Sequence, residues 1–138
     1  MEKRVSLEEA VRFHGHLGPY LVLGILAGEL AAKRLKFERH FGLEIKVWGA
    51  ARKPKSCLID GLQLATGATY GKGNIEKFDG PEIKIELVNR ADNKKITLTI
   101  VDSLVACLEQ ARTHKDCETL ARKLYKEKND GAFRIRYL

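Results

Sequence analysis

The sequence of 138 residues has little of what marks several specialised protein classes. It holds only three cysteines, an odd number at wide spacing, which excludes a disulfide framework and indicates reduced thiols in the cytoplasm. With 3 prolines, 12 glycines and 44% hydrophobic residues, the composition is neither collagen-like nor that of a disordered chain. Length and composition predict a single folded domain over residues 1–138.

Long hydrophobic runs are also absent. The longest segment without Asp, Glu, Lys or Arg lies between Arg12 and Glu29 and is not uniformly apolar, whereas a spanning helix needs about 20 apolar residues. The charged N-terminus is not followed by the apolar segment of a secretory signal. We therefore expect a cytoplasmic protein without membrane contact.

Side-chain amides are scarce, with two Gln and four Asn, while Lys and Glu are plentiful, a bias typical of thermophilic proteins. The net charge of +7 permits nucleic acid or a small anionic molecule as partner. The basic residues are spread along the chain, and the aromatic residues, 7% of the total, form no stacking motif of nucleic-acid-binding domains. The sequence therefore disfavours nucleic acid.

Hydrophobic periodicity predicts helices and strands that do not alternate regularly. Ser6 and Glu9 have the spacing of a capping box, which opens a short helix ending near His14, and Pro19 suits the first turn of a second helix to about Lys36. Alternation predicts a strand over Gly42–Trp48, a strand after the loop 67–74, a hairpin of strands around 83–87 and 96–100, and an edge strand over Phe133–Leu138. Three more helices are predicted: one over Cys57–Thr66 capped by Ser56, one over Ser103–Arg112 capped by Asp102, and one over Asp116–Lys128 capped by Asp116. We therefore predict an α+β fold, a mostly antiparallel sheet with the N-terminal and C-terminal helices packed on it.

Three small residues share one face of the second predicted helix. Gly24, Gly28 and Ala32 are spaced four apart, which lets another backbone approach this face closely. The neighbour on this face is predicted to be a core strand or a partner subunit.

Two histidines separated by one glycine, His14 and His16, stand just before the second helix. Gly15 permits the backbone turn that would direct both imidazoles at a common point. A metal pair or an acid–base histidine is one interpretation, and two structural histidines at a helix junction are the other.

Cys57 occupies the first position of a predicted helix, behind a basic segment over 52–55. A helix N-terminus and nearby cations both favour the thiolate, which is the nucleophile and the metal ligand. Asp60 and Gln63 follow on the same helix face and complete a polar stripe; the alternative is a small buried cysteine with a stripe facing solvent. Cys107 and Cys117 fall in apolar helical patterns, which predicts that both are core residues.

The segment 67–74 is rich in glycine but is not a nucleotide-binding P-loop. Gly67 and Gly71 stand one residue too close, and Gly73 occupies the place of the magnesium-binding hydroxyl. Two interpretations stay open: the backbone and Lys72 receive an anion, or the segment is only a conformationally demanding connection.

Three segments, taken in order, resemble the core domain of the FmdE family, which takes its name from a component of formylmethanofuran dehydrogenase. They are Phe13-His-Gly-His-Leu-Gly-Pro19 followed by Gly24, Ser56-Cys-Leu-Ile-Asp-Gly-Leu-Gln63, and Thr66-Gly-Ala-Thr-Tyr-Gly-Lys-Gly-Asn74. The resemblance covers about residues 7–78. It implies an α+β core, a homodimer and a metal site, commonly zinc. The metal ligands that it implies are His14, His16 and Cys57, with Asp60 and Gln63 beside them and Lys72 and Asn74 in the nearby loop. We further predict that Asp60 is a general base and that Gln63, Lys72 and Asn74 bind an anionic substrate.

The sequence departs from the family pattern at three places. Many relatives have a cysteine at the positions that Gly18 and Ala68 occupy here, and some have a C-terminal zinc finger. Cys107 and Cys117 cannot supply the four ligands of such a finger, so we expect none. The expected metal site therefore has fewer protein ligands than is usual in the family: two histidines, one thiolate and an open position.

Two hypotheses of different kinds follow. In the first, the protein holds one zinc or another divalent transition metal and binds or transforms a small anionic metabolite of one-carbon (formyl) metabolism. In the second, it is a non-catalytic, homodimeric accessory or ligand-binding module of a larger oxidoreductase complex, with a degenerate metal site.

Overall fold

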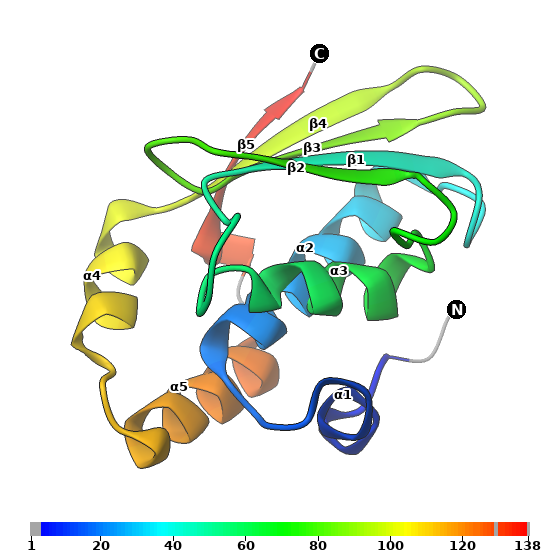
Figure 1. Cartoon of the computed structure of the whole chain (residues 1–138). Helices are drawn as coiled ribbons and strands as arrows, with labels where there is room; N and C mark the ends of the chain where they lie inside the picture. The colour runs from blue at the N-terminus through cyan, green and yellow to red at the C-terminus, as the bar shows by residue number, and fades with distance from the viewer. Residues whose placement is uncertain (1–3, 129, 138) are drawn as a thin grey trace.

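The protein consists of a five-stranded β-sheet with α-helices on one of its faces (Figure 1). The computed structural model describes residues 4–128 and 130–137. In chain order the elements are α1 (Leu7–His14), α2 (Pro19–Leu35), β1 (Leu43–Trp48), α3 (Cys57–Thr66), β2 (Ile75–Phe78), β3 (Lys84–Asn89), β4 (Lys95–Ile100), α4 (Asp102–Gln110), α5 (His114–Glu127), a 3₁₀ turn (Asp130–Ala132) and β5 (Phe133–Tyr137). This order is the predicted one, and the predicted edge strand is β5, although Leu138 lies outside the described residues.

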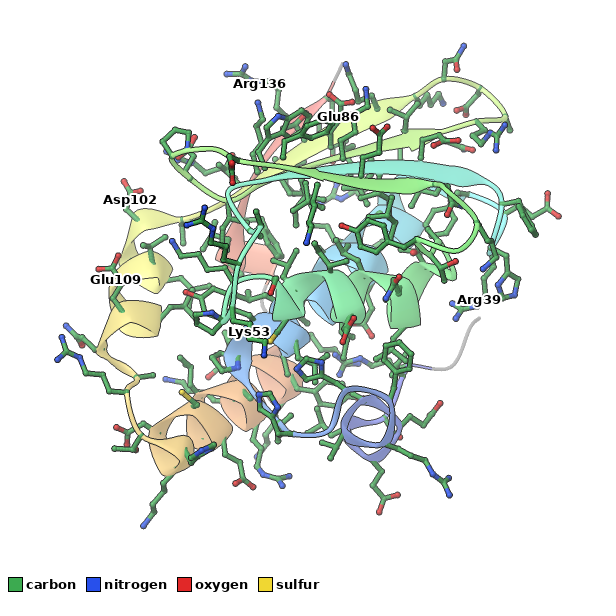
Figure 2. All side chains as sticks on the ribbon, in the orientation of Figure 1. Arg39, Lys53, Glu86, Asp102, Glu109 and Arg136 are labelled. Carbon is green, nitrogen blue, oxygen red and sulfur yellow. The ribbon has the colours of Figure 1, made fainter. Side chains whose placement is uncertain are left out.

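The sheet is mixed but mostly antiparallel, which confirms the α+β fold. Its strands are ordered β2-β1-β3-β4-β5, and of the described pairs only β1–β2 is parallel, joined through α3 as a parallel crossover requires. Ile45, Ile85 and Leu98 point into the core and are at most 1% exposed. Figure 2 shows Glu86 and Arg136 on the opposite face, turned away from the helices.

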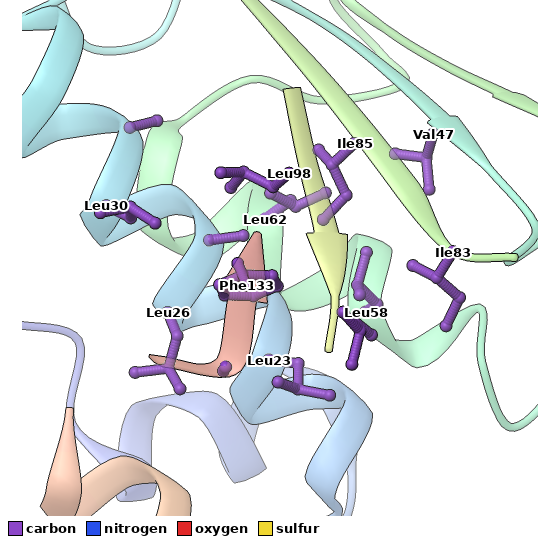
Figure 3. Close-up of a cluster of buried hydrophobic side chains, with 14 of the residues drawn as sticks. Leu23, Leu26, Leu30, Val47, Leu58, Leu62, Ile83, Ile85, Leu98 and Phe133 are labelled. Carbon is purple, nitrogen blue, oxygen red and sulfur yellow. The ribbon is translucent and has the colours of Figure 1, made fainter. Parts of the chain in front are cut away.

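Helix α2 runs through the middle of the helical layer and is buried on nearly every side. A helix that is apolar all round belongs to a protein interior. Figure 3 shows Leu23 and Leu26 of α2 in one cluster with Leu58 and Leu62 of α3 and Leu98 of β4. Among the described residues, no helix combines the length and the apolar character needed to cross a bilayer.

The small-residue face of α2 packs against α3 of the same chain, not against a strand or a partner subunit. A Cβ atom added at Gly24 would come within 2.0 Å of the Leu58 carbonyl oxygen, and one added at Gly61 within 2.1 Å of the Leu21 carbonyl oxygen. Gly28 likewise faces Ala65. Both predicted neighbours were therefore wrong, because glycine on both helices allows α2 and α3 to touch backbone to backbone.

Three of the predicted helix caps are not made. Ser56 has a helical backbone and no capping bond, and α4 starts one residue earlier than predicted, with Val101 as its N-cap and Asp102 as its first residue. Helix α5 starts at residue 114, where the Thr113 hydroxyl accepts a hydrogen bond from the Asp116 amide. Asp116 thus lies inside the first turn, where its negative charge interacts favourably with the positive end of the helix dipole.

The two C-terminal cysteines differ in environment. Cys107 is exposed on α4, so the prediction that it is a core residue was wrong: α4 buries only Leu104 and Leu108, and its remaining side chains face outward. Cys117 is half-buried on α5 and lines a cleft, so it is not a core residue either. Its thiol donates to the Ala111 carbonyl oxygen at 3.3 Å.

Candidate metal centre

The predicted ligands His14, His16 and Cys57 come together in the folded chain. Their ligand atoms all lie within 4.8 Å of one another. His14 is the last residue of α1, His16 stands in the α1–α2 connection, and Cys57 is the first residue of α3. Two imidazoles and a thiolate from three positions make a donor set that zinc prefers.

Local sequence explains how the two histidines meet. The capping box predicted at Ser6 and Glu9 is present and fixes the start of α1. Gly15 ends the helix in the left-handed conformation at φ 109°, which few other residues tolerate. The chain therefore turns sharply, and the His14 and His16 rings lie 4.7 Å apart between centroids.

His14 is held by a carboxylate behind it. Its Nδ1 donates to Asp60 Oδ2 at 2.6 Å, and its side chain is 11% exposed. The opposite ring nitrogen, Nε2, is buried and has no hydrogen-bond partner among the described residues. Because the carboxylate can only accept, the neutral ring keeps its lone pair on Nε2, the atom that a metal would need.

The thiol of Cys57 departs from expectation. Burial raises its pKa, and the Asp60 carboxylate raises it further, while Lys53 and a backbone hydrogen bond act in the opposite direction. Figure 2 shows Lys53 at the N-terminal end of α3. The favoured thiolate predicted from the helix N-terminus was thus wrong for the metal-free protein, because desolvation of the charged sulfur outweighs the nearby cation.

His16 is the exposed member of the group. Burial of its ring lowers the pKa of the imidazole, and the neighbouring rings of His14 and His114 lower it further. The neutral imidazole is the form that binds a metal.

The residues fit one tetrahedral metal after a small movement. Around a zinc ion, nitrogen and sulfur ligands lie about 3.5 Å from one another. The present separations of up to 4.8 Å therefore need to close by roughly 1 Å. Exposed His16 can make that movement, while His14 is fixed by Asp60 and its orphaned Nε2 gains a partner.

The other predicted site residues lie on or beyond α3. Gln63 bridges Asp60 and the loop 67–74. The Lys72 ammonium donates to the Gly67 carbonyl oxygen at 2.8 Å, and Asn74, 3% exposed, donates to the His40 carbonyl oxygen at 2.7 Å. Both side chains thus hold the loop in place, and their part in binding an anion stays a prediction.

A cleft of about 380 Å³ opens beside the candidate ligands. His16 and Cys57 line one side of it. Its remaining walls include Pro19, Tyr20, Pro54 and the end of α4, the α4–α5 connection and the start of α5, among them Leu108, Glu109, Arg112, His114 and Cys117. Sequence analysis missed these residues because no local pattern says that α4 and α5 turn back toward α2.

One of the two missing thiols maps onto the site. A Cβ atom added at Gly18 would lie 3.7 Å from His16 Nε2, an ordinary contact, and the Gly18 backbone is extended, as any residue allows. The second position, Ala68, is completely buried in the hydrophobic core. The glycine therefore leaves open the side of His16 at which the family resemblance implies a cysteine as a fourth ligand.

Comparisons with known proteins find relatives in sequence and in fold. The chain is 31% identical over 98 residues to a "Probable S-adenosyl-L-methionine-binding protein" of Archaeoglobus fulgidus; the match covers 68% of this chain but only 26% of that protein. In fold it resembles the crystal structure of a tungsten formylmethanofuran dehydrogenase FmdE-like protein from Syntrophus aciditrophicus, with a TM-score of 0.65 and 18% identity over 96% of this chain and 69% of the other. The family model described as "FmdE, Molybdenum formylmethanofuran dehydrogenase operon" matches residues 13–136. With nearly its whole length matched, the chain belongs to the FmdE family.

Proposed function

We propose that this protein binds one divalent transition metal, zinc in the first place, through His14, His16 and Cys57, and presents it to a small anionic ligand in the adjacent cleft. The observation that carries the proposal is the buried Nε2 of His14, which finds no hydrogen-bond partner in the described part of the chain and belongs to the same group as the other two donors. A buried polar atom without a partner is costly, and a metal would remove that cost.

The structure supports distinct tasks for the surrounding residues. Asp60 orients His14 through Nδ1, so its geometry supports a positioning role in place of the general base predicted from sequence. Cys57 releases its proton on binding a cation, and His16 closes onto the site from the exposed side. A metal held by three protein ligands supplies an open Lewis-acid position that polarises a carbonyl or activates water.

The cleft supports a small anionic ligand. Arg112 and His114 stand in its wall at the N-terminal end of α5, where the helix dipole also favours negative charge. Apolar side chains, among them Leu108 and Pro19, also line the cleft. A volume of about 380 Å³ suits a metabolite rather than a macromolecule. The family description, which names a formylmethanofuran dehydrogenase operon, supports a ligand from one-carbon metabolism.

Metal binding is tested by titrating the metal-free protein with Co²⁺ and measuring the thiolate-to-cobalt charge-transfer absorption. We expect one equivalent to bind with this absorption present, and Cys57→Ser to abolish it. Cys107→Ser is the matched control, because its thiol is exposed on α4 outside the group of donors. Binding without the charge-transfer band, or a band that survives in Cys57→Ser, would remove Cys57 from the site.

The ligand is tested separately on the metal-loaded protein by calorimetry. Formate, larger carboxylates and S-adenosyl-L-methionine, the ligand named in the description of the Archaeoglobus relative, make a suitable panel. We expect a carboxylate to bind and Arg112→Gln to weaken it about tenfold, the loss typical of a charge-assisted hydrogen bond. A chain that takes up no metal would instead favour the non-catalytic accessory role, with a partner surface other than the α2 face that α3 covers.

A further inference from the structure

A chain of hydrogen bonds runs along α3 from the loop 67–74 to the candidate ligand His14. The Tyr70 amide donates to Gln63 Oε1 at 3.1 Å, and Gln63 Nε2 donates to Asp60 Oδ1 at 3.3 Å. Asp60 Oδ2 then accepts from His14 Nδ1 at 2.6 Å. Asp60 and Gln63 stand one turn apart on the polar face of α3, and the chain connects segments that are distant in sequence.

The loop end of this chain fixes the orientation of the Gln63 side-chain amide. A backbone amide can only donate, so the side-chain oxygen of Gln63 must face Tyr70. The amide nitrogen of Gln63 is therefore the atom that reaches Asp60, and it supplies a donor to the carboxylate oxygen that His14 does not use. Both oxygens of Asp60 are thus held, and the carboxylate plane is fixed toward His14.

From this geometry we propose that Gln63 is a positioning residue of the metal site. It acts through Asp60 to keep His14 in the tautomer that has Nδ1 protonated and Nε2 free. The inference rests on the proposed metal site, and it replaces the anion-binding role that sequence analysis gave to Gln63. The loop 67–74 then acts as the outer support of the site, since Tyr70 sets the orientation of Gln63.

The sharpest perturbation is Gln63→Glu, which keeps the shape of the side chain. One oxygen of the new carboxylate still accepts from Tyr70, but the other faces Asp60 Oδ1 across a gap that now holds no donor. Repulsion between the two carboxylates pushes Asp60 away and weakens its hydrogen bond to His14 Nδ1. Changes to residues that orient a metal ligand lower metal affinity by about 10- to 100-fold. We expect a loss of about tenfold here, because Gln63 contacts Asp60 and not the ligand His14 itself.

The matched control is Gln110→Glu, the same change at the only other glutamine of the sequence. Gln110 is exposed at the end of α4 and makes none of these contacts. Competition titrations of Co²⁺ and Zn²⁺ should show the loss in Gln63→Glu and not in Gln110→Glu. Gln63→Met, which removes the donor without adding charge, should give a smaller loss.

A second readout needs no metal. Long-range ¹H–¹⁵N spectra of the metal-free wild-type protein should show His14 as the Nδ1–H tautomer, and Gln63→Glu should shift it to a mixture. Equal affinities in Gln63→Glu and Gln110→Glu, with an unchanged tautomer, would overturn the role of Gln63 while leaving the metal site intact. If the wild-type protein bound no metal, the proposed function would fail, and the tautomer spectra would still decide whether Gln63 orients His14.

Discussion

The contact between α2 and α3 makes Gly24→Ala a demanding test of the structure. The new Cβ atom would lie 2.0 Å from the Leu58 carbonyl oxygen, whereas carbon and oxygen atoms normally approach to about 3.3 Å. The overlap is with backbone on the facing helix, so no side-chain rotation relieves it. The two helices must move apart by roughly 1 Å, and overpacking of this kind costs about 1–3 kcal/mol.

The expected net loss of unfolding free energy is smaller than the packing cost. Alanine gains about 1 kcal/mol over glycine in a helix interior, which offsets part of the clash. With the clash at the upper end of its range, Gly24→Ala should lose about 2 kcal/mol. The assay is urea unfolding followed by circular dichroism, with Gly71→Ala as control, since its added Cβ meets only Thr69 Oγ1 at 3.7 Å.

The same substitution should weaken the metal site, because moving α3 carries Cys57 away from the histidines. Cobalt affinity measured on the folded fraction should fall in Gly24→Ala and stay unchanged in Gly71→Ala. A Gly24→Ala protein as stable as the wild type, with unchanged cobalt affinity, would refute both the backbone contact and its role in placing Cys57.

Three further predictions concern the site and the helix ends. Gly18→Cys should raise zinc affinity by about tenfold or more in chelator competition, because its thiol would stand beside His16 as a fourth ligand; no gain would place the position outside the site. In the metal-free protein, alkylation of Cys57 followed by peptide mapping should reach half its maximal rate at higher pH than alkylation of the cysteine in a short unstructured peptide, because burial raises the pKa of the Cys57 thiol. A lower midpoint would contradict the desolvated environment. In urea unfolding, Thr113→Ala should lower the free energy of unfolding by about 1 kcal/mol, because it removes the N-cap bond of α5. Ser56→Ala should change it by less than about 0.5 kcal/mol, because the Ser56 side chain makes no capping bond. Equal losses would refute the observed helix starts.

The strands, whose alternation of apolar and polar residues follows their burial, were predicted correctly. Alternation at residues such as Ile85 and Leu98 identified the strands, because the period of two follows directly from the pleat of a half-buried sheet. The capping box at Ser6 and the glycine at residue 15 fixed α1, because both signals act within one turn of the chain.

Features that depend on tertiary contact were not predicted. Cys107 fits an apolar helical pattern and is nevertheless exposed, because periodicity gives a face and cannot say whether anything covers it. Gly24 and Gly28 were known to permit close approach, but the identity of the approaching element came only from the structure. The grouping of Cys57 with the two histidines was available through the family resemblance alone, since nothing local connects them.

The two walls of the cleft, which we propose as the ligand site, come from separate parts of the chain. Its metal-side wall is encoded by residues up to Cys57, while the facing wall is encoded by a separate segment from Leu108 to Cys117. Substitutions or insertions in that second segment alter what the cleft accepts without touching His14, His16 or the contact between α2 and α3. On the proposed function, we therefore expect chains that keep the three candidate donors but differ in this second segment to accept different small molecules.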